Sequence, residues 1–183
     1  MNLTITKTFL EDVLVIEPEF YEDDRGYFIE SFNKKAFNDY IGETEFVQDN
    51  HSFSYMGVLR GIHFQNSPFQ QGKLVRVIQG TVFDVAVDLR KDSKSFGQWV
   101  GITLSDKKKN QLWIPEGFGH AFLTLSETAH FLYKTTNFYN KGSEVTISWD
   151  DSDIGIEWPE LNTGRINLSE KDIQGISLKM FLK

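Results

Sequence analysis

Alternation of hydrophobic and polar residues over short stretches is the main pattern in this sequence. Residues 82–89 show it most clearly, because the odd positions from Phe83 to Leu89 are all apolar and would form one face of a strand. The even positions carry two carboxylates, Asp84 in mid-strand and Asp88 near its end. We expect Asp88 to be solvated, and we expect Asp84 to need a polar partner if its face is buried.

Similar short runs, rich in β-branched and aromatic residues, recur along the chain and are bounded by glycine, proline or polar turn residues. One short helix is predicted at residues 34–40, ending before Gly42, and residues 168–172 are interpreted as a polar loop. Many short strands at close spacing predict an all-β sandwich or barrel, with the jelly roll as the leading candidate. The predicted strands cover residues 74–78, 82–89, 99–104, 111–114, 121–125, 130–136 and 145–149.

Composition narrows the possible functions. A chain of 183 residues with 40% hydrophobic residues can bury one core, so we expect a single domain over residues 1–183. The absence of cysteine excludes disulfides, a thiolate nucleophile and thiolate metal ligands. No stretch approaches the roughly 20 apolar residues of a membrane span, and no signal peptide is evident, so we expect a cytoplasmic protein. The net charge of −7 argues against nucleic acid or anionic membranes as partners.

His63 is the first candidate for chemistry, within the segment Val58–Gln65. A strict two-residue period would place Arg60 and His63 on opposite faces of a strand. A bulge or kink at Gly61 could turn both side chains into one cavity. From the pattern alone, a hydrogen-bonded structural histidine is the more common interpretation.

Lys73, Tyr133 and His120 are further candidates, each with an ordinary structural alternative. Lys73 begins a predicted strand and could pair with Asp84 if the two strands form a hairpin, although strand-end lysines are usually solvated. Tyr133 would share a face with Phe131, as core aromatics do. His120 follows a glycine-rich turn of the kind that lines the mouth of a barrel.

Metal and cofactor motifs are scarce. Small β-barrels of the cupin kind often bind a metal through two histidines one residue apart and a carboxylate, and this chain has no such pair. A site built from distant single histidines stays open as an alternative. Neither a P-loop nor a GxGxxG fingerprint is present, so Walker-type phosphoryl transfer and Rossmann-type nicotinamide binding are not supported. The four histidines are His51, His63, His120 and His130.

Seven segments, in order along nearly the whole chain, resemble the dTDP-4-dehydrorhamnose 3,5-epimerase family. The resemblance implies a cupin-type jelly roll with a few short helices, which works as a homodimer in which the partner chain supplies part of each site. It also implies a nucleotide-linked 4-keto-6-deoxy sugar as substrate, with no cofactor and no metal. The segments are residues 23–28, 46–52, 58–65, 71–76, 82–90, 111–122 and 153–159.

The resemblance assigns roles to particular residues. It implies His63 as the proton acceptor, Asp172 as the carboxylate that orients it, Tyr133 as the proton donor, and Lys73 as the cation near the carbonyl. Aromatic residues such as Tyr27 or Phe28 could stack on the nucleotide base. The implied substrate contacts are Arg25, Glu30, Gln48, Asp49, Asn50, Arg60, His120, Glu144 and Lys171.

The chemistry of such a substrate explains this set of residues. Carbons 3 and 5 both flank the carbonyl, so removal of a proton from either gives an enolate on the same oxygen, which one cation can stabilise. Inversion needs a proton delivered to the opposite face, which requires a second acid. Three alternatives stay open: a mono-epimerase, a catalytically silent sugar-nucleotide-binding jelly roll, and a metal-dependent cupin.

Overall fold

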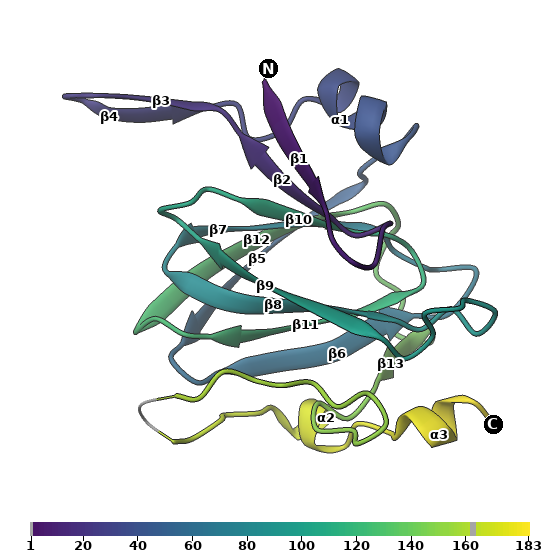
Figure 1. Ribbon diagram of the computed structural model, residues 1–183. Coiled ribbons are helices and arrows are strands. Elements are labelled where there is room, and N and C mark those ends of the chain that lie inside the picture. The colour runs from purple at the N-terminus through teal and green to yellow at the C-terminus, as the bar shows by residue number, and fades with distance from the viewer. Residues whose placement is uncertain (1, 162–163) are drawn as a thin grey trace.

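Two antiparallel sheets face each other in the computed structural model, which describes residues 2–161 and 164–183 (Figure 1). The six-stranded sheet has the order β1 (Leu3–Lys7), β2 (Leu14–Pro18), β10 (Gln111–Ile114), β7 (Lys73–Gln79), β12 (Thr128–Thr135) and β5 (Gln48–Tyr55). The five-stranded sheet has the order β13 (Glu144–Thr146), β6 (Leu59–Gln65), β11 (Phe118–Thr124), β8 (Thr81–Asp88) and β9 (Trp99–Ser105). The prediction of an all-β jelly-roll sandwich is confirmed.

Strand alternation builds the core between the sheets. Val75 and Phe131 of the six-stranded sheet pack in the same cluster as Val82, Ala86 and other residues of the five-stranded sheet. The expected facing of residues 82–89 is therefore correct, because the even positions of β8 point into the sandwich. The odd positions pack on the opposite side against the C-terminal segment.

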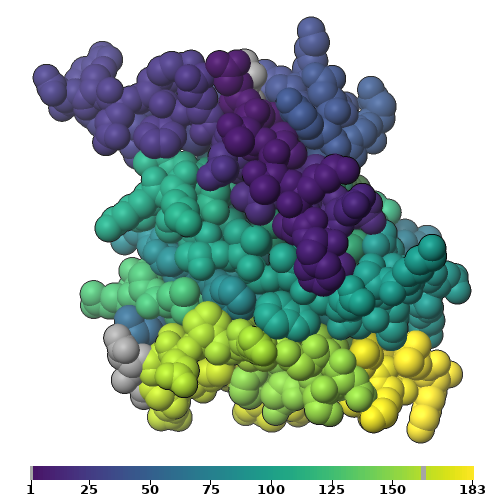
Figure 2. Space-filling view, in the orientation of Figure 1, coloured from purple at the N-terminus to yellow at the C-terminus, as the bar shows by residue number. Residues whose placement is uncertain are grey.

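Each sheet is partly covered on its outer side. Helix α1 (Lys34–Ile41) begins after its N-cap Asn33, whose side chain accepts a hydrogen bond from the Ala36 amide, and it buries Phe37 beside Trp113. The C-terminal segment, with helices α2 (Glu170–Ile173) and α3 (Leu178–Phe181), forms a layer along the five-stranded sheet (Figure 2). In the described ranges no helix is long and apolar enough to cross a membrane.

A two-stranded hairpin, β3 (Phe20–Asp23) with β4 (Gly26–Ile29), projects away from the sandwich (Figures 1 and 2). The ammonium group of Lys109 lies 4.4 Å from the ring centroid of Phe20 and 4.1 Å from that of Tyr27. These cation–π contacts connect the hairpin to the body. The tip and outer face of the hairpin remain exposed.

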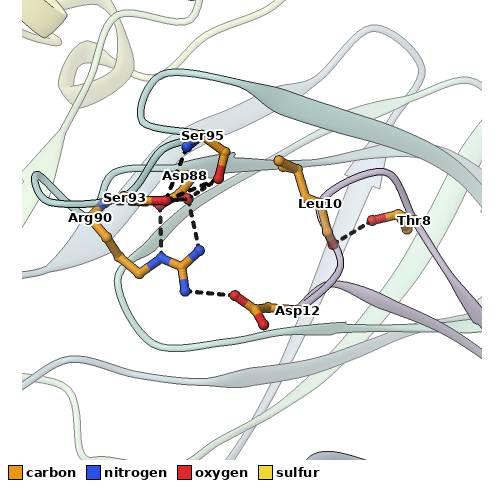
Figure 3. Close-up of polar contacts among 7 residues, drawn as sticks. All are labelled: Thr8, Leu10, Asp12, Asp88, Arg90, Ser93 and Ser95. Atoms are coloured by element: carbon orange, nitrogen blue, oxygen red, sulfur yellow. Dashed lines mark hydrogen bonds and ion pairs between the residues drawn. The ribbon is translucent and has the colours of Figure 1, made fainter.

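Three local expectations are wrong. Asp88 is not solvated: its side chain is fully buried and accepts hydrogen bonds from Arg90, Ser93 and Ser95 (Figure 3). The reason is that the turn after β8 folds back over the end of the strand. Strands β7 and β8 do not form a paired hairpin, because they belong to different sheets.

The segment 168–172 is the third error, because it is not simply a polar loop. Residues from Glu170 onward form α2, and Ser169 caps the helix by accepting a hydrogen bond from the amide of Asp172 at 3.2 Å. The cap turns Asp172 toward the sandwich, where its side chain is 3% exposed. A charged residue in a polar segment is therefore one of the buried groups of the protein.

Candidate active site

A cavity of about 240 Å³ opens between the two sheets. Strands β6 and β11 form one wall, and β7 and β12 form the other. The cavity brings together residues from the two sheets, the loop after β12 and helix α2. It is lined by Ser52, Arg60, His63, Phe64, Gln65, Gln71, Lys73, His120, Phe122, Tyr133, Tyr139, Glu144 and Lys171.

A β-bulge in β6 presents Arg60 and His63 to this one cavity. Arg60 pairs with Phe122 and His63 pairs with His120, so β6 has one more residue than β11 between these two pairs. Gly61 lies in the bulge with φ of 124°, and a Cβ atom there would come within 2.4 Å of the Cβ of Ala121. Only glycine fits this position, and the expected bulge at Gly61 is confirmed.

His63 is backed by the buried carboxylate of Asp172. Its Nε2 lies 2.6 Å from Asp172 Oδ1, and Ser169 Oγ donates to Asp172 Oδ2 at 2.6 Å. Burial would raise the pKa of Asp172, but the hydrogen bonds from His63 and Ser169 lower it. An ionised Asp172 accepts the Nε2 proton and leaves Nδ1 of His63 as the basic nitrogen.

Burial also affects the imidazole itself. It lowers the pKa of His63, while the hydrogen bond with Asp172 opposes this and the charge of Lys171 reinforces it. The neutral form of His63 therefore persists at neutral pH, as a general base requires.

Lys73 lies inside the cavity rather than in solvent. It is 7% exposed, and its Nζ donates a hydrogen bond to the carbonyl of His63 at 3.3 Å. Burial lowers the pKa of Lys73 to about 8, although the charges of Asp84 and Glu144 oppose this fall. A cation beside the base can stabilise negative charge that develops on a bound carbonyl.

Tyr133 comes from the opposite wall to His63. It belongs to β12, in the inward row that also holds Phe131, whereas His63 belongs to β6 of the other sheet. Burial raises the pKa of Tyr133, the charge of Glu144 raises it further, and Arg60 acts against both. The phenol therefore keeps its proton at neutral pH and can donate it across the cavity.

Several of the implied substrate contacts also line the cavity. Glu144 and Lys171 form an ion pair of 2.7 Å at its edge, and the hydroxyl of Tyr139 donates to Glu144 at 3.1 Å. Arg60 is held by hydrogen bonds to Ser54 Oγ at 3.1 Å and to the carbonyl of Phe53 at 3.3 Å. His120 completes this group, with its Nε2 2.9 Å from Asp84 Oδ2.

The other implied contacts lie outside the cavity lining. Arg25 is at the tip of the hairpin and pairs with Asp23, and Glu30 follows β4 and accepts a hydrogen bond from Asn33. On β5, Gln48 bonds to Asn50 in the inward row, and Asp49 points outward to an ion pair of 2.8 Å with Lys134.

Tyr139 is a cavity residue that sequence reasoning did not identify. Its ring is half exposed at the cavity, on the loop after β12, and no periodic pattern marks that loop. Tyr27 and Phe28, the aromatic residues suggested for the base, lie instead on the projecting hairpin. In the parts of the chain that the structure describes, no three His, Asp or Glu side chains converge in a way that could hold a metal ion.

Comparisons with known proteins agree with this architecture. The model of the dTDP-4-dehydrorhamnose 3,5-epimerase family matches residues 7–180. The enzyme of that name from Shigella flexneri is 56% identical over 174 residues, which is 94% of each chain.

Two solved structures show the same fold. One, from Legionella pneumophila Philadelphia 1, is described as a dTDP-6-deoxy-D-glucose-3,5-epimerase in complex with dTDP-4-keto-L-rhamnose. It superposes with a TM-score of 0.94 at 47% identity, covering 98% of this chain and 94% of that one. The other, a 3′-monoepimerase from Streptomyces bikiniensis in complex with dTDP-quinovose, superposes with a TM-score of 0.88 at 30% identity, covering 94% and 87%. This chain belongs to the dTDP-4-dehydrorhamnose 3,5-epimerase family.

Proposed function

We propose that this protein inverts carbons 3 and 5 of dTDP-4-dehydro-6-deoxy-D-glucose to give dTDP-4-dehydro-L-rhamnose, as a step toward dTDP-L-rhamnose. One observation carries the proposal: a histidine backed by a buried carboxylate and a protonated tyrosine face one cavity from opposite sheets. A protein that only binds a nucleotide sugar has no need of an opposed base and acid, and the family relationship supports the same substrate class.

The first chemical step is proton removal. Nδ1 of His63 takes the proton from carbon 5 or carbon 3, and the electron pair of the broken C–H bond moves to form the enolate on the carbonyl oxygen. Lys73 stabilises that oxygen in both half-reactions, because both carbons flank the same carbonyl. Asp172 supports the imidazolium that forms on His63.

The second step is proton return on the other face. Tyr133 donates its phenolic proton to the carbon from the opposite wall, and the enolate collapses to the ketone with the centre inverted. His63 then carries one extra proton and Tyr133 lacks one, so exchange with solvent must restore both groups before the next inversion. These side chains and solvent together account for every proton in the cycle.

The nucleotide end of the substrate would lie at the cavity mouth. Arg60 offers a planar guanidinium suited to a diphosphate, and the half-exposed ring of Tyr139 offers a surface on which a base could stack. Arg25 and Glu30 would complete the site from a second copy of the chain, since they lie outside the cavity of their own chain. The homodimer, the single domain over residues 1–183 and the cytoplasmic location stay predictions.

Solvent-exchange NMR tests the function. In D₂O and without added cofactor, the wild-type protein should introduce deuterium at both carbon 3 and carbon 5 of the substrate. His63→Ala should reduce exchange at both carbons by about 10³-fold while leaving nucleotide binding largely intact, because it removes the base alone.

His130→Ala is a matched control, since His130 bonds to His51 and does not line the cavity. Exchange at only one carbon would assign the protein to the mono-epimerases. Wild-type exchange in His63→Ala would contradict the proposal, and loss of activity on exhaustive chelation would support the metal-dependent alternative.

A further inference from the structure

A second buried histidine–carboxylate pair lies next to the pair formed by His63 and Asp172. His120 of β11 lies directly opposite His63 of β6 in the strand register, and its Nε2 is 2.9 Å from Asp84 Oδ2. Asp84 is fully buried behind His120, and it is not part of the cavity lining. The cavity therefore contains two neighbouring imidazoles, each with a carboxylate behind it.

A contribution to the stability of the fold does not explain why Asp84 is buried. Its Oδ1 is buried and has no hydrogen-bond partner among the residues that the structure describes. A buried carboxylate oxygen without a partner destabilises the folded state. Buried groups that cost stability in this way are found preferentially at functional sites.

Asp88 provides the contrast within the same strand. It belongs to the same inward row of β8 and is also fully buried, but five hydrogen bonds from Arg90, Ser93 and Ser95 satisfy its two oxygens. It does not line the cavity. One carboxylate of this row is therefore a satisfied structural group, and the other faces the charged groups of the cavity.

Two groups of the cavity are the electrostatic partners of Asp84. Burial raises the pKa of Asp84, and the charges of His120 and Lys73 oppose that rise. Burial lowers the pKa of Lys73 to about 8, and Asp84 is the first of the charges that act against this, followed by Glu144, whereas Lys171 reinforces the fall. The carboxylate thus acts on two pocket residues that come from different sheets.

We infer that Asp84 is a positioning residue for the reaction: it orients His120 by accepting its Nε2 proton and supports the positive charge of Lys73. Packing fixes the plane of the ring, since His120 stacks on Phe131 with ring centroids 5.9 Å apart. Asp84 then decides which nitrogen carries the proton. The inference rests on the proposed function for its catalytic meaning.

Asp84→Asn tests this role, because it keeps the size of the side chain and removes the charge. We expect kcat to fall roughly 10²-fold with KM changed less than about threefold, since an orienting carboxylate acts on the chemical step. We also expect the alkaline limb of the kcat/KM profile to move to lower pH, because the charge that supports Lys73 is gone. The melting temperature should not fall, since the variant removes a buried charge.

Asp88→Asn is the control, a matched substitution in the same strand and row. It should lower the melting temperature and leave kcat and the alkaline limb unchanged. The inference is overturned if Asp84→Asn keeps wild-type kcat and pH profile, or if it behaves like Asp88→Asn.

NMR of ¹⁵N-labelled histidine provides a readout that does not depend on activity. In the wild-type protein Nε2 of His120 should be protonated, and in Asp84→Asn the Nδ1-protonated tautomer should become populated. A wild-type His120 protonated only on Nδ1 overturns the inference even if Asp84→Asn does not fold. Absence of exchange at both carbons in the wild type would instead reject the proposed function, and the NMR result would still test the orientation.

Discussion

At the scale of single residues, the cavity strengthens the protonation states that the proposed reaction needs. His63 is neutral, with its pKa lowered by burial, and Tyr133 is protonated, with its pKa raised by burial. The same physical cause, removal from water, thus suits His63 to the proposed role of proton acceptor and Tyr133 to the proposed role of proton donor. The pKa of Lys73 is about 8, which is close to neutral pH, so its charge there depends on Asp84 and Glu144.

Tyr133→Phe should separate proton removal from inversion. The variant keeps His63, so deuterium should still exchange at the carbons next to the carbonyl, but the deuteron should return to the face from which the proton left. Epimerised product should fall by about 10²- to 10³-fold, because the opposed acid is lost. Proton NMR of the recovered substrate measures exchange and configuration together.

Tyr40→Phe is the control for this variant, since Tyr40 is exposed on α1 and does not line the cavity. Full inversion by Tyr133→Phe at the wild-type rate would contradict the assignment of the acid.

At the scale of the elements, strand β8 shows what local pattern determines and what tertiary position determines. Alternation predicts the two faces of β8 correctly, because it depends only on the pleat of one strand. It does not distinguish the roles of Asp84 and Asp88. That difference arises because β11 places His120 beside Asp84, whereas the turn after β8 places Arg90 and two serines around Asp88 (Figure 3).

Asp88→Asn should destabilise the protein in a pH-dependent way. Burial would raise the pKa of Asp88, but hydrogen bonds from Arg90, Ser93 and Ser95 lower it to about 2. Because the folded-state pKa is depressed, this contribution is fully present above the unfolded value of about 4 and is lost as the pH falls toward about 2. We expect a loss of about 2 kcal/mol in the free energy of unfolding at pH 7.

Urea unfolding at pH 7 and at low pH measures this difference, which should shrink at the lower pH. Asp92→Asn changes an exposed carboxylate of the same turn and should have little effect at either pH. An equal loss of stability at both pH values would contradict the electrostatic explanation.

At the scale of the whole molecule, the projection of the hairpin β3–β4 from the sandwich has no explanation within a single chain. The hairpin projects from the sandwich (Figure 1), and Arg25 at its tip does not line the cavity of its own chain. Large exposed apolar side chains, Phe53 and Tyr55 of the edge strand β5 and Ile78 of β7, lie on the six-stranded sheet. Exposed aromatic residues on a sheet edge favour contact with another chain.

Subunit complementation tests whether the hairpin serves a partner. Arg25→Ala and His63→Ala homodimers should each be impaired, but a mixed dimer would combine an intact hairpin with an intact base in one of its two sites. Random reassembly should restore about a quarter of wild-type activity, because half of the dimers are mixed and each has one intact site. Activity of the refolded mixture measures this, against each variant refolded alone.

No recovery in dimers that size-exclusion chromatography shows to be mixed would mean that Arg25 acts within its own chain or not at all.

The local pattern of apolar, polar and turn residues was sufficient to predict much of the fold. Alternation and turn residues predict β7 to β10 and helix α1 within a residue or two, and they indicate the bulge at Gly61. They do not predict β1 to β5, which are short or polar, and they place the start of β11 three residues late and extend β13 too far. The residues at which a strand begins and ends depend on hydrogen-bonding partners that are remote in sequence.

The family relationship could also be inferred from the sequence, because its motifs are strings of specific residues in order. Which side chains meet was decided by the tertiary structure. Asp172 reaches His63 across 109 residues only because α2 packs against β6, and Tyr133 opposes His63 only because their strands lie in different sheets. The proposed base and acid lie on facing walls because two sheets pack at a fixed separation, and no local pattern in either strand encodes that separation.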